Sequence, residues 1–176
     1  MLVVVLVAAF AILMIIAKPP TPKEQFTQRM NGSVKRVVDG DTLLLIFNSE
    51  ETRIRLAFID APESRQDHGA EATASLRSLL QSKAVMVETF EEDRYGRTIA
   101  RLWWHRVDDD MWVDLNLMMI ESGFAWHYVD VARGMQTPAD LKRYQDAESN
   151  ARSLPIGLWA HHNPMEPWDF RRGRNR

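Results

Sequence analysis

The sequence contains no cysteine among its 176 residues. Disulfide bonds, thiolate zinc sites and cysteine nucleophiles are therefore excluded. The chain also lacks an excess of basic residues, because its net charge is -2 and its pI is about 6.2. Proteins that coat nucleic acid are commonly basic, so this balance disfavours that class, although it allows an enzyme with a local basic site. The hydrophobic fraction of 45% is enough for a packed core.

The first 17 residues, MLVVVLVAAFAILMIIA, lack any polar side chain. This run is longer than the apolar core of a usual signal peptide and slightly shorter than a typical membrane span. No basic residue precedes it, and Lys18 and Lys23 follow it, which by the positive-inside rule disfavours export of the rest of the chain. We predict a signal or transmembrane anchor segment over residues 1–17, because soluble helices carry a polar face. The sequence leaves open whether it is cleaved or retained.

Composition divides the remaining chain into three parts. Residues 18–32 are rich in proline and charge and are predicted to be a linker. Residues 33–154 carry regular hydrophobic patterns and are predicted to form the folded domain. Residues 155–176 form a tail rich in tryptophan and arginine.

Hydrophobic periodicity predicts five strands and about three helices in the folded domain. The strands are expected at residues 33–38, 42–47, 53–60, 84–90 and 98–104. The helices are expected at residues 69–82, 113–123 and 137–153. Five short strands with one inserted helix are typical of a small closed barrel. We therefore predict an α+β, mainly β, fold: a five-stranded OB-fold barrel with about three helices, plus an N-terminal hydrophobic helix.

Charged residues gather at the ends of these strands, and each has an ordinary structural explanation. An Asp-Gly pair is a frequent hairpin corner, and a DAPE sequence forms a capped turn. An arginine in a strand is commonly solvated. The four clusters are Asp39 with Asp41, Arg55, Asp60 with Glu63, and Arg97.

Taken together, these charges match the requirements of phosphodiester hydrolysis. A hard cation is bound by carboxylate and carbonyl oxygens. A base must lie near the attacking water, and guanidinium groups suit the negative charge that gathers on the phosphate. Two aspartates would bind the cation, one glutamate would act as the base, and two arginines would contact the phosphate.

The same stretches carry a family resemblance. VVDGDT, RIRLAFIDAPES, the GAEA helix start, DRYGRTIARL and the helix ending ESGFAW resemble, in this order, the staphylococcal nuclease (thermonuclease) family. The match covers residues 34–129 well and the later helix more loosely. The resemblance implies an OB-fold barrel with helices and one Ca²⁺ ion. It also implies an endonuclease that hydrolyses DNA and RNA with little sequence specificity and leaves 3'-phosphates. We expect a monomer whose partners are these substrates and, through residues 1–17, the membrane.

The resemblance also implies how the metal is bound. Asp41 and Asp60 correspond to the family's carboxylate ligands, and the third ligand is the backbone carbonyl of Ala61. Alanine replaces the family's usual threonine there, and a carbonyl ligand survives that change. Asp39 matches an acidic residue that tunes the site without binding the metal directly.

The catalytic and substrate-binding residues carry over in the same way. Glu63 falls on the general base, and Arg55 and Arg97 fall on the two phosphate-binding arginines. Tyr95 matches a tyrosine near the nucleotide pocket, and Tyr128 is a weaker candidate for substrate binding. The group that protonates the leaving oxygen is not assigned. Four arginines of the tail could contact phosphates or simply be solvated: Arg171, Arg172, Arg174 and Arg176.

Two other functions compete with this one. The run His161-His162-Asn163 superficially resembles the histidine-asparagine clusters of HNH nucleases, although prolines and a tryptophan surround it. The second alternative is a non-catalytic OB-fold module, tethered to a membrane, that binds nucleic acid or a protein. Such a module would use exposed aromatic residues, but two adjacent tryptophans on a strand face opposite sides, so at least one of them should be in the core. The tryptophans that could serve as exposed binding residues are Trp103, Trp104 and Trp112.

The predicted activity bears on location. A calcium-dependent nuclease without sequence specificity would endanger its own genome. We therefore expect the domain to lie outside the cytoplasm, either anchored to the membrane or secreted after signal cleavage. This argument conflicts with the lysines that follow the apolar run.

Overall fold

The computed structural model describes residues 29–173 except 48, 82 and 83. The predicted anchor segment and most of the predicted linker lie outside these residues. Within the part of the chain that is described, no helix is both long and apolar enough to cross a membrane.

Five strands close into a barrel, which confirms the predicted five-stranded OB-fold barrel; the predicted N-terminal helix lies outside the described residues. Antiparallel pairing runs in the order β3-β2-β1-β5-β6, and a parallel pairing of β3 with β6 closes the ring. A short strand, β7, extends the sheet beyond β6. The strands of this sheet are β1 (Arg29–Val37), β2 (Thr42–Phe47), β3 (Glu50–Leu56), β5 (Ala84–Glu92), β6 (Thr98–Arg106) and β7 (Met111–Asp114).

The third predicted strand is in fact two strands. β3 ends at Leu56, the chain turns at Phe58 with φ of 69°, and β4 (Ile59–Asp60) pairs with β8 (Trp126–His127). A positive φ is unfavourable for a bulky residue. It is retained here because the Phe58 ring is buried and packs edge-on against Phe90 and Tyr144. The turn takes the chain out of the barrel sheet, so that Asp60 pairs with Trp126 in a separate two-stranded sheet.

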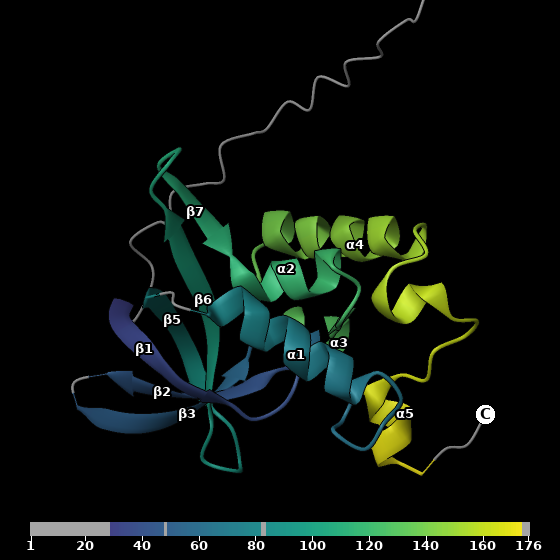
Figure 1. Cartoon of the computed structure of the whole chain (residues 1–176), viewed down its shortest axis with the longest axis horizontal. Coiled ribbons are helices and arrows are strands. Elements are labelled where there is room, and N and C mark those ends of the chain that lie inside the picture. The colour runs from purple at the N-terminus through teal and green to yellow at the C-terminus, as the bar shows by residue number, and fades with distance from the viewer. Residues whose placement is uncertain (1–28, 48, 82–83, 174–176) are drawn as a thin grey trace, which may run out of the picture.

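The helices lie on one side of the barrel, with α4 alongside α2 (Figure 1). Among the described residues there are five α-helices and one 3-10 helix, more than the three expected, and the additional ones are short. The predicted helix at 113–123 begins at Leu115, because the two residues before it pair with β6 as part of β7. The helices are α1 (Gly69–Leu80), α2 (Leu115–Glu121), α3 (Val129–Ala132), α4 (Pro138–Arg152), η1 (Gly157–Ala160) and α5 (Pro167–Arg171).

A closed cluster of charges joins the barrel to α4. Arg101 on β6 donates two hydrogen bonds of 2.9 Å to the Glu88 carboxylate on β5, and Trp103 donates a third of 2.7 Å. The Tyr144 hydroxyl donates to Asp114 at 2.9 Å, and burial raises the pKa of both Asp114 and Tyr144. We call these five buried residues the Glu88–Arg101 cluster. Burial of Trp103 confirms that at least one of the adjacent tryptophans lies in the core.

Residues 155–173, which we call the C-terminal segment, pack against the domain. Leu158 is fully buried and its N–H donates to the carbonyl of Gly123 at 2.8 Å. Trp159 and Trp168 both pack edge-on against Trp126 of β8, with ring centroids 5.5 and 6.5 Å apart. Figure 1 shows this segment returning along the helical side so that α5 lies next to one end of α1.

Candidate active site

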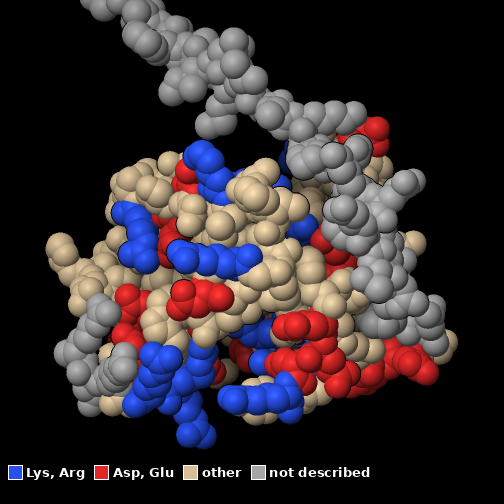
Figure 2. All heavy atoms as spheres, turned by 180° about the vertical axis from the view of Figure 1, so that it is seen from behind, with Lys and Arg blue, Asp and Glu red and all other residues tan. Residues whose placement is uncertain are grey.

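One pocket of about 790 Å³ brings together all the site residues that the sequence predicted. It lies where the ends of β2, β3 and β4 meet the turn between β5 and β6. On the face seen in Figure 2, basic and acidic side chains lie next to each other around a hollow near the lower edge. The predicted residues that line the pocket are Asp39, Asp41, Arg55, Asp60, Ala61, Glu63, Tyr95, Arg97 and Tyr128.

The Asp-Gly-Asp corner between β1 and β2 is shaped by its own side chains. The Asp39 carboxylate accepts a hydrogen bond from the Asp41 N–H at 3.1 Å, which holds the loop. A Cβ on Gly40 would lie 2.7 Å from the Cβ of Ala61, so only glycine allows the loop to approach this closely. The Ala61 N–H and the Thr42 hydroxyl then donate to the two Asp41 carboxylate oxygens, at 2.9 and 3.1 Å. These contacts fix Asp41 at the floor of the pocket.

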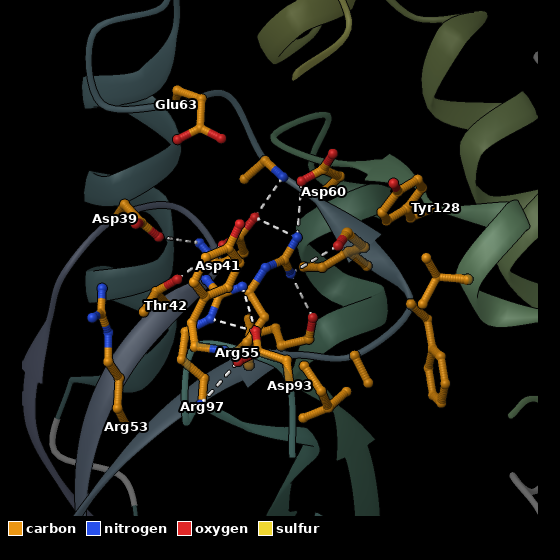
Figure 3. A pocket seen from close by; sticks show the side chains of 18 of the residues that line it. Asp39, Asp41, Thr42, Arg53, Arg55, Asp60, Glu63, Asp93, Arg97 and Tyr128 are labelled. Atoms are coloured by element: carbon orange, nitrogen blue, oxygen red, sulfur yellow. Dashed lines mark hydrogen bonds and ion pairs between the residues drawn. The ribbon is translucent and has the colours of Figure 1, made fainter. Parts of the chain in front are cut away.

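The Arg55 side chain is anchored beneath the carboxylates of Asp41 and Asp60. Its Nη1 donates to the carbonyls of Leu56 and Ile59, at 2.6 and 2.9 Å, and its side chain is only 11% exposed. Its Nη2 lies 2.8 Å from Asp60 Oδ1 and 3.1 Å from Asp41 Oδ2 (Figure 3). The turn at Phe58 makes this geometry possible, because it places the Ile59 carbonyl and Asp60 within reach of one guanidinium.

Burial makes the negative charge of this site unfavourable. Burial, followed by repulsion from Asp41, raises the pKa of Asp39 to about 6. Burial also raises the pKa of Asp60, although hydrogen bonds and charge from Arg171 and Arg55 oppose the rise. Buried carboxylates require positive charge nearby. Arg55 and Arg171 supply that charge here, and we call Asp41 and Asp60 with these two arginines the Asp41–Asp60 cluster.

Glu63 lies above the two aspartates, in the loop that leads to α1 (Figure 3). Its N–H donates to the Gln66 side chain at 3.1 Å, and the Gln66 amide in turn donates to the carbonyl of Met165 at 2.6 Å. The Glu63 carboxylate is 38% exposed and accepts a hydrogen bond from Arg171 Nη1 at 2.8 Å. The C-terminal segment thus contacts the Glu63 loop at two points.

Arg97 and Tyr95 form a different wall of the pocket, on the turn between β5 and β6. Arg97 donates to the Asp93 carboxylate from Nε at 2.7 Å, and Arg94 and Arg97 both lie over the Tyr95 ring. Burial alone would raise the pKa of Asp93, but hydrogen bonds from Arg97 and the backbone lower it. Tyr95 is 65% exposed. This wall offers a cation and an aromatic ring to a ligand in the pocket.

The structure adds residues that the sequence analysis had not assigned to the site. Trp168 of α5 stacks on Tyr128 with ring centroids 5.5 Å apart and planes at 8°. Arg53 also lines the pocket. It could have been found from sequence, because residues two apart on a strand share a face and Arg55 was already assigned. No local pattern identifies Trp168, since its place depends on the folding of the C-terminal segment.

The atoms that the Asp41–Asp60 cluster offers as metal ligands fit a hard divalent cation. They are carboxylate oxygens at the floor of an open pocket, which suit calcium or magnesium rather than a soft metal. Across residues 29–173, apart from the gaps noted above, no group of three or more histidine, aspartate or glutamate side chains is arranged to bind a metal. A bound ion would thus need backbone carbonyl or water oxygens in addition to Asp41 and Asp60. His161 and His162, the basis of the HNH alternative, are exposed.

Comparison with known proteins identifies related chains. The family described as "Staphylococcal nuclease homologue" matches residues 53–161. A protein named micrococcal nuclease from Shigella flexneri is 38% identical over 144 residues, which cover 80% of each chain. An uncharacterized endonuclease from Escherichia coli O157:H7 is 35% identical, over 81% of this chain and 85% of its own. Protein ParB from Escherichia coli is 32% identical, over 96% of this chain and 91% of its own.

Proposed function

The chain belongs to the staphylococcal nuclease family and is a nuclease, and we propose that it is a calcium-dependent endonuclease of DNA and RNA. The observation that carries the proposal is the convergence, in one pocket, of carboxylates and guanidiniums from separate parts of the chain. Two buried aspartates, one partly exposed glutamate and two arginines from different elements match the needs of phosphodiester hydrolysis. The proposed products end in 3'-phosphates.

The proposed metal ligands are Asp41, Asp60 and the backbone carbonyl of Ala61. When bound, calcium would supply positive charge to a phosphate oxygen. The hydrogen bonds from Ala61 and Thr42 to Asp41 keep the carboxylate oriented before any ion arrives. Asp39 supports the loop and, through its own charge, the attraction of the site for cations.

Glu63 is the proposed general base. Its carboxylate lies near the mouth of the pocket and is 38% exposed, so water can reach it. It would take a proton from a water that attacks the phosphorus opposite the leaving 5'-oxygen. The Gln66 side chain, by accepting from the Glu63 N–H, holds the loop in place for this step.

Arg55 and Arg97 are the proposed phosphate-binding residues. Each guanidinium is already held by carboxylates or carbonyls, so its position is fixed before substrate binds. Preorganised donors of this kind stabilise the negative charge that develops on the phosphate. Tyr95 and Tyr128, which both line the pocket, are the proposed contacts for the adjoining nucleotides.

Digestion of plasmid DNA and of RNA by the purified protein tests this proposal. We expect cleavage with calcium, little with magnesium and none with chelator. The DNA products should block polymerase extension until a phosphatase removes the 3'-phosphate. Absence of cleavage with any metal, while circular dichroism shows an intact fold, would contradict the proposal and favour the non-catalytic binding module.

A further inference from the structure

Arg171, on the last helix of the described chain, reaches the floor of the candidate site. Its Nη2 donates to Asp60 Oδ2 at 2.7 Å and its Nη1 donates to Asp60 Oδ1 at 3.1 Å. The same Nη1 donates to Glu63 Oε1 at 2.8 Å. One guanidinium from α5 therefore holds the proposed metal ligand and the proposed base together.

These bonds use the oxygen lone pairs that a metal would need. An ionised carboxylate offers about four acceptor positions, two on each oxygen. Asp60 Oδ1 accepts from both Arg55 and Arg171, and Oδ2 accepts from Arg171. The Asp60 side chain is fully buried, so its remaining freedom to reorient is small. An ion that binds Asp60 from the pocket must compete with the Arg171 guanidinium.

The two arginines on Asp60 differ in how firmly they are held. Arg55 is 11% exposed and is anchored by two backbone carbonyls as well as by carboxylates. Arg171 is 41% exposed, and among the described residues its side chain donates hydrogen bonds only to Asp60 and Glu63. It also belongs to a helix of five residues. Of the two arginines on Asp60, Arg171 is the less firmly held.

We propose that Arg171 is a resident cation of the Asp41–Asp60 cluster that a divalent metal ion displaces. The proposal rests on the metal dependence proposed above. Until the ion arrives, Arg171 neutralises Asp60 and pairs with Glu63, so the base is occupied. Metal binding breaks both contacts, which couples the arrival of the ion to the release of the base.

The size of the effect follows from competition. When only a fraction of a protein is competent to bind, its apparent affinity equals the intrinsic affinity multiplied by that fraction. If Arg171 occupies the cluster about nine-tenths of the time, calcium affinity is lowered about tenfold. Removing the side chain should raise the affinity by the same factor.

Titration calorimetry with calcium on the full-length protein tests this inference without measuring cleavage. We expect Arg171→Gln to bind calcium about tenfold more tightly than the unsubstituted protein. Arg172→Gln removes the same charge one residue further along, on an exposed side chain, and should change the affinity little. Arg171→Lys keeps the charge but cannot form the forked contact with two carboxylates. Its calcium affinity should therefore lie between that of the unsubstituted protein and that of Arg171→Gln.

Thermal unfolding gives an independent measurement. In chelator, Arg171→Gln should lower Tm more than Arg172→Gln, because it leaves Asp60 with one guanidinium fewer. In saturating calcium the two variants should have the same Tm. Equal or weaker calcium binding by Arg171→Gln would overturn the inference while leaving the metal-dependent function in place. Absence of calcium binding by every variant, the unsubstituted protein included, would overturn both.

Discussion

Two buried charge clusters in this protein use the same residue types for different purposes. In the Glu88–Arg101 cluster, a strand arginine neutralises carboxylates inside the core, and Glu88, Arg101 and Asp114 are all at most 5% exposed. In the Asp41–Asp60 cluster, a strand arginine again bridges two carboxylates, but their oxygens face a pocket. The contrast shows that the surroundings of a buried ion pair, rather than its composition, decide whether it can accept an outside ligand.

The partners of the carboxylates also differ between the clusters. Glu88 is satisfied by Arg101 and by the Trp103 indole, which are held within β6. Asp60 is satisfied in part by Arg171, which comes from a short helix at the end of the described chain. A cluster closed by rigid strands stabilises the fold, whereas one closed by a displaceable side chain is suited to exchange of ligands.

Removing a carboxylate from the pocket should have the largest effect. We expect Asp41→Asn to lower the rate of DNA cleavage about a thousandfold, because a metal contributes several kcal/mol to the transition state. Asparagine can still accept the hydrogen bond from Ala61, so Tm should change little. Parallel cleavage assays and thermal unfolding check this. Near-normal cleavage would show that Asp41 lies outside the reaction.

Breaking the closed cluster should instead affect stability. Arg101→Met leaves Glu88 and Asp114 buried without their shared cation, and we expect the free energy of unfolding to fall by about 3–5 kcal/mol. Urea unfolding measures this loss. Arg106→Met, which removes an arginine from an exposed pair with Asp109, is the control and should change stability little. Equal effects of the two substitutions would mean that the closed cluster is not essential to the fold.

Substitution at the aromatic edge of the pocket should have a smaller effect. Base stacking contributes about 1–3 kcal/mol per base, and Trp168 already covers one face of Tyr128. We expect Tyr128→Ala to raise KM about tenfold with little change in kcat, and Tyr128→Phe to retain most of the affinity. Steady-state kinetics on a short oligonucleotide separate the two constants. A fall in kcat at unchanged KM would place Tyr128 among the reacting groups.

The histidines of the C-terminal segment should have the smallest effect. His162 is exposed and lies outside the residues that line the pocket. We expect His162→Ala to leave both the cleavage rate and Tm within experimental error of the unsubstituted protein. Near-complete loss of cleavage would favour the HNH alternative and would remove the contrast between the two clusters.

Local sequence patterns were sufficient for the five strands of the barrel, and the family resemblance named the predicted residues that line the pocket. The alternation over residues 53–56, where Ile54 and Leu56 are buried and the two arginines are not, depends on one face being buried and is visible in the sequence. The start of α2 was predicted two residues early, because pairing of β7 with β6 overrides the helical pattern at Val113. Such tertiary effects leave no local signal.

The geometry of the site depends on features that the sequence does not display. The positive φ of Phe58 separates β3 from β4 and brings Asp60 to Arg55, although the residue sits in an apparently continuous strand pattern. The contact of Arg171 with Asp60 spans 111 residues. The tail arginines could therefore be named as candidates, but their partner could not.

The most direct test of the contrast between the clusters compares Glu63→Gln with Glu88→Gln. Both substitutions remove one carboxylate charge, the first in the pocket and the second in the closed core. We expect Glu63→Gln to lower calcium-dependent cleavage by about 10²–10⁴-fold at unchanged Tm. Glu88→Gln should lower Tm while the folded protein cleaves at its normal rate. Normal cleavage by Glu63→Gln, or a comparable loss by folded Glu88→Gln, would contradict the assignment of the Asp41–Asp60 pocket as the active site.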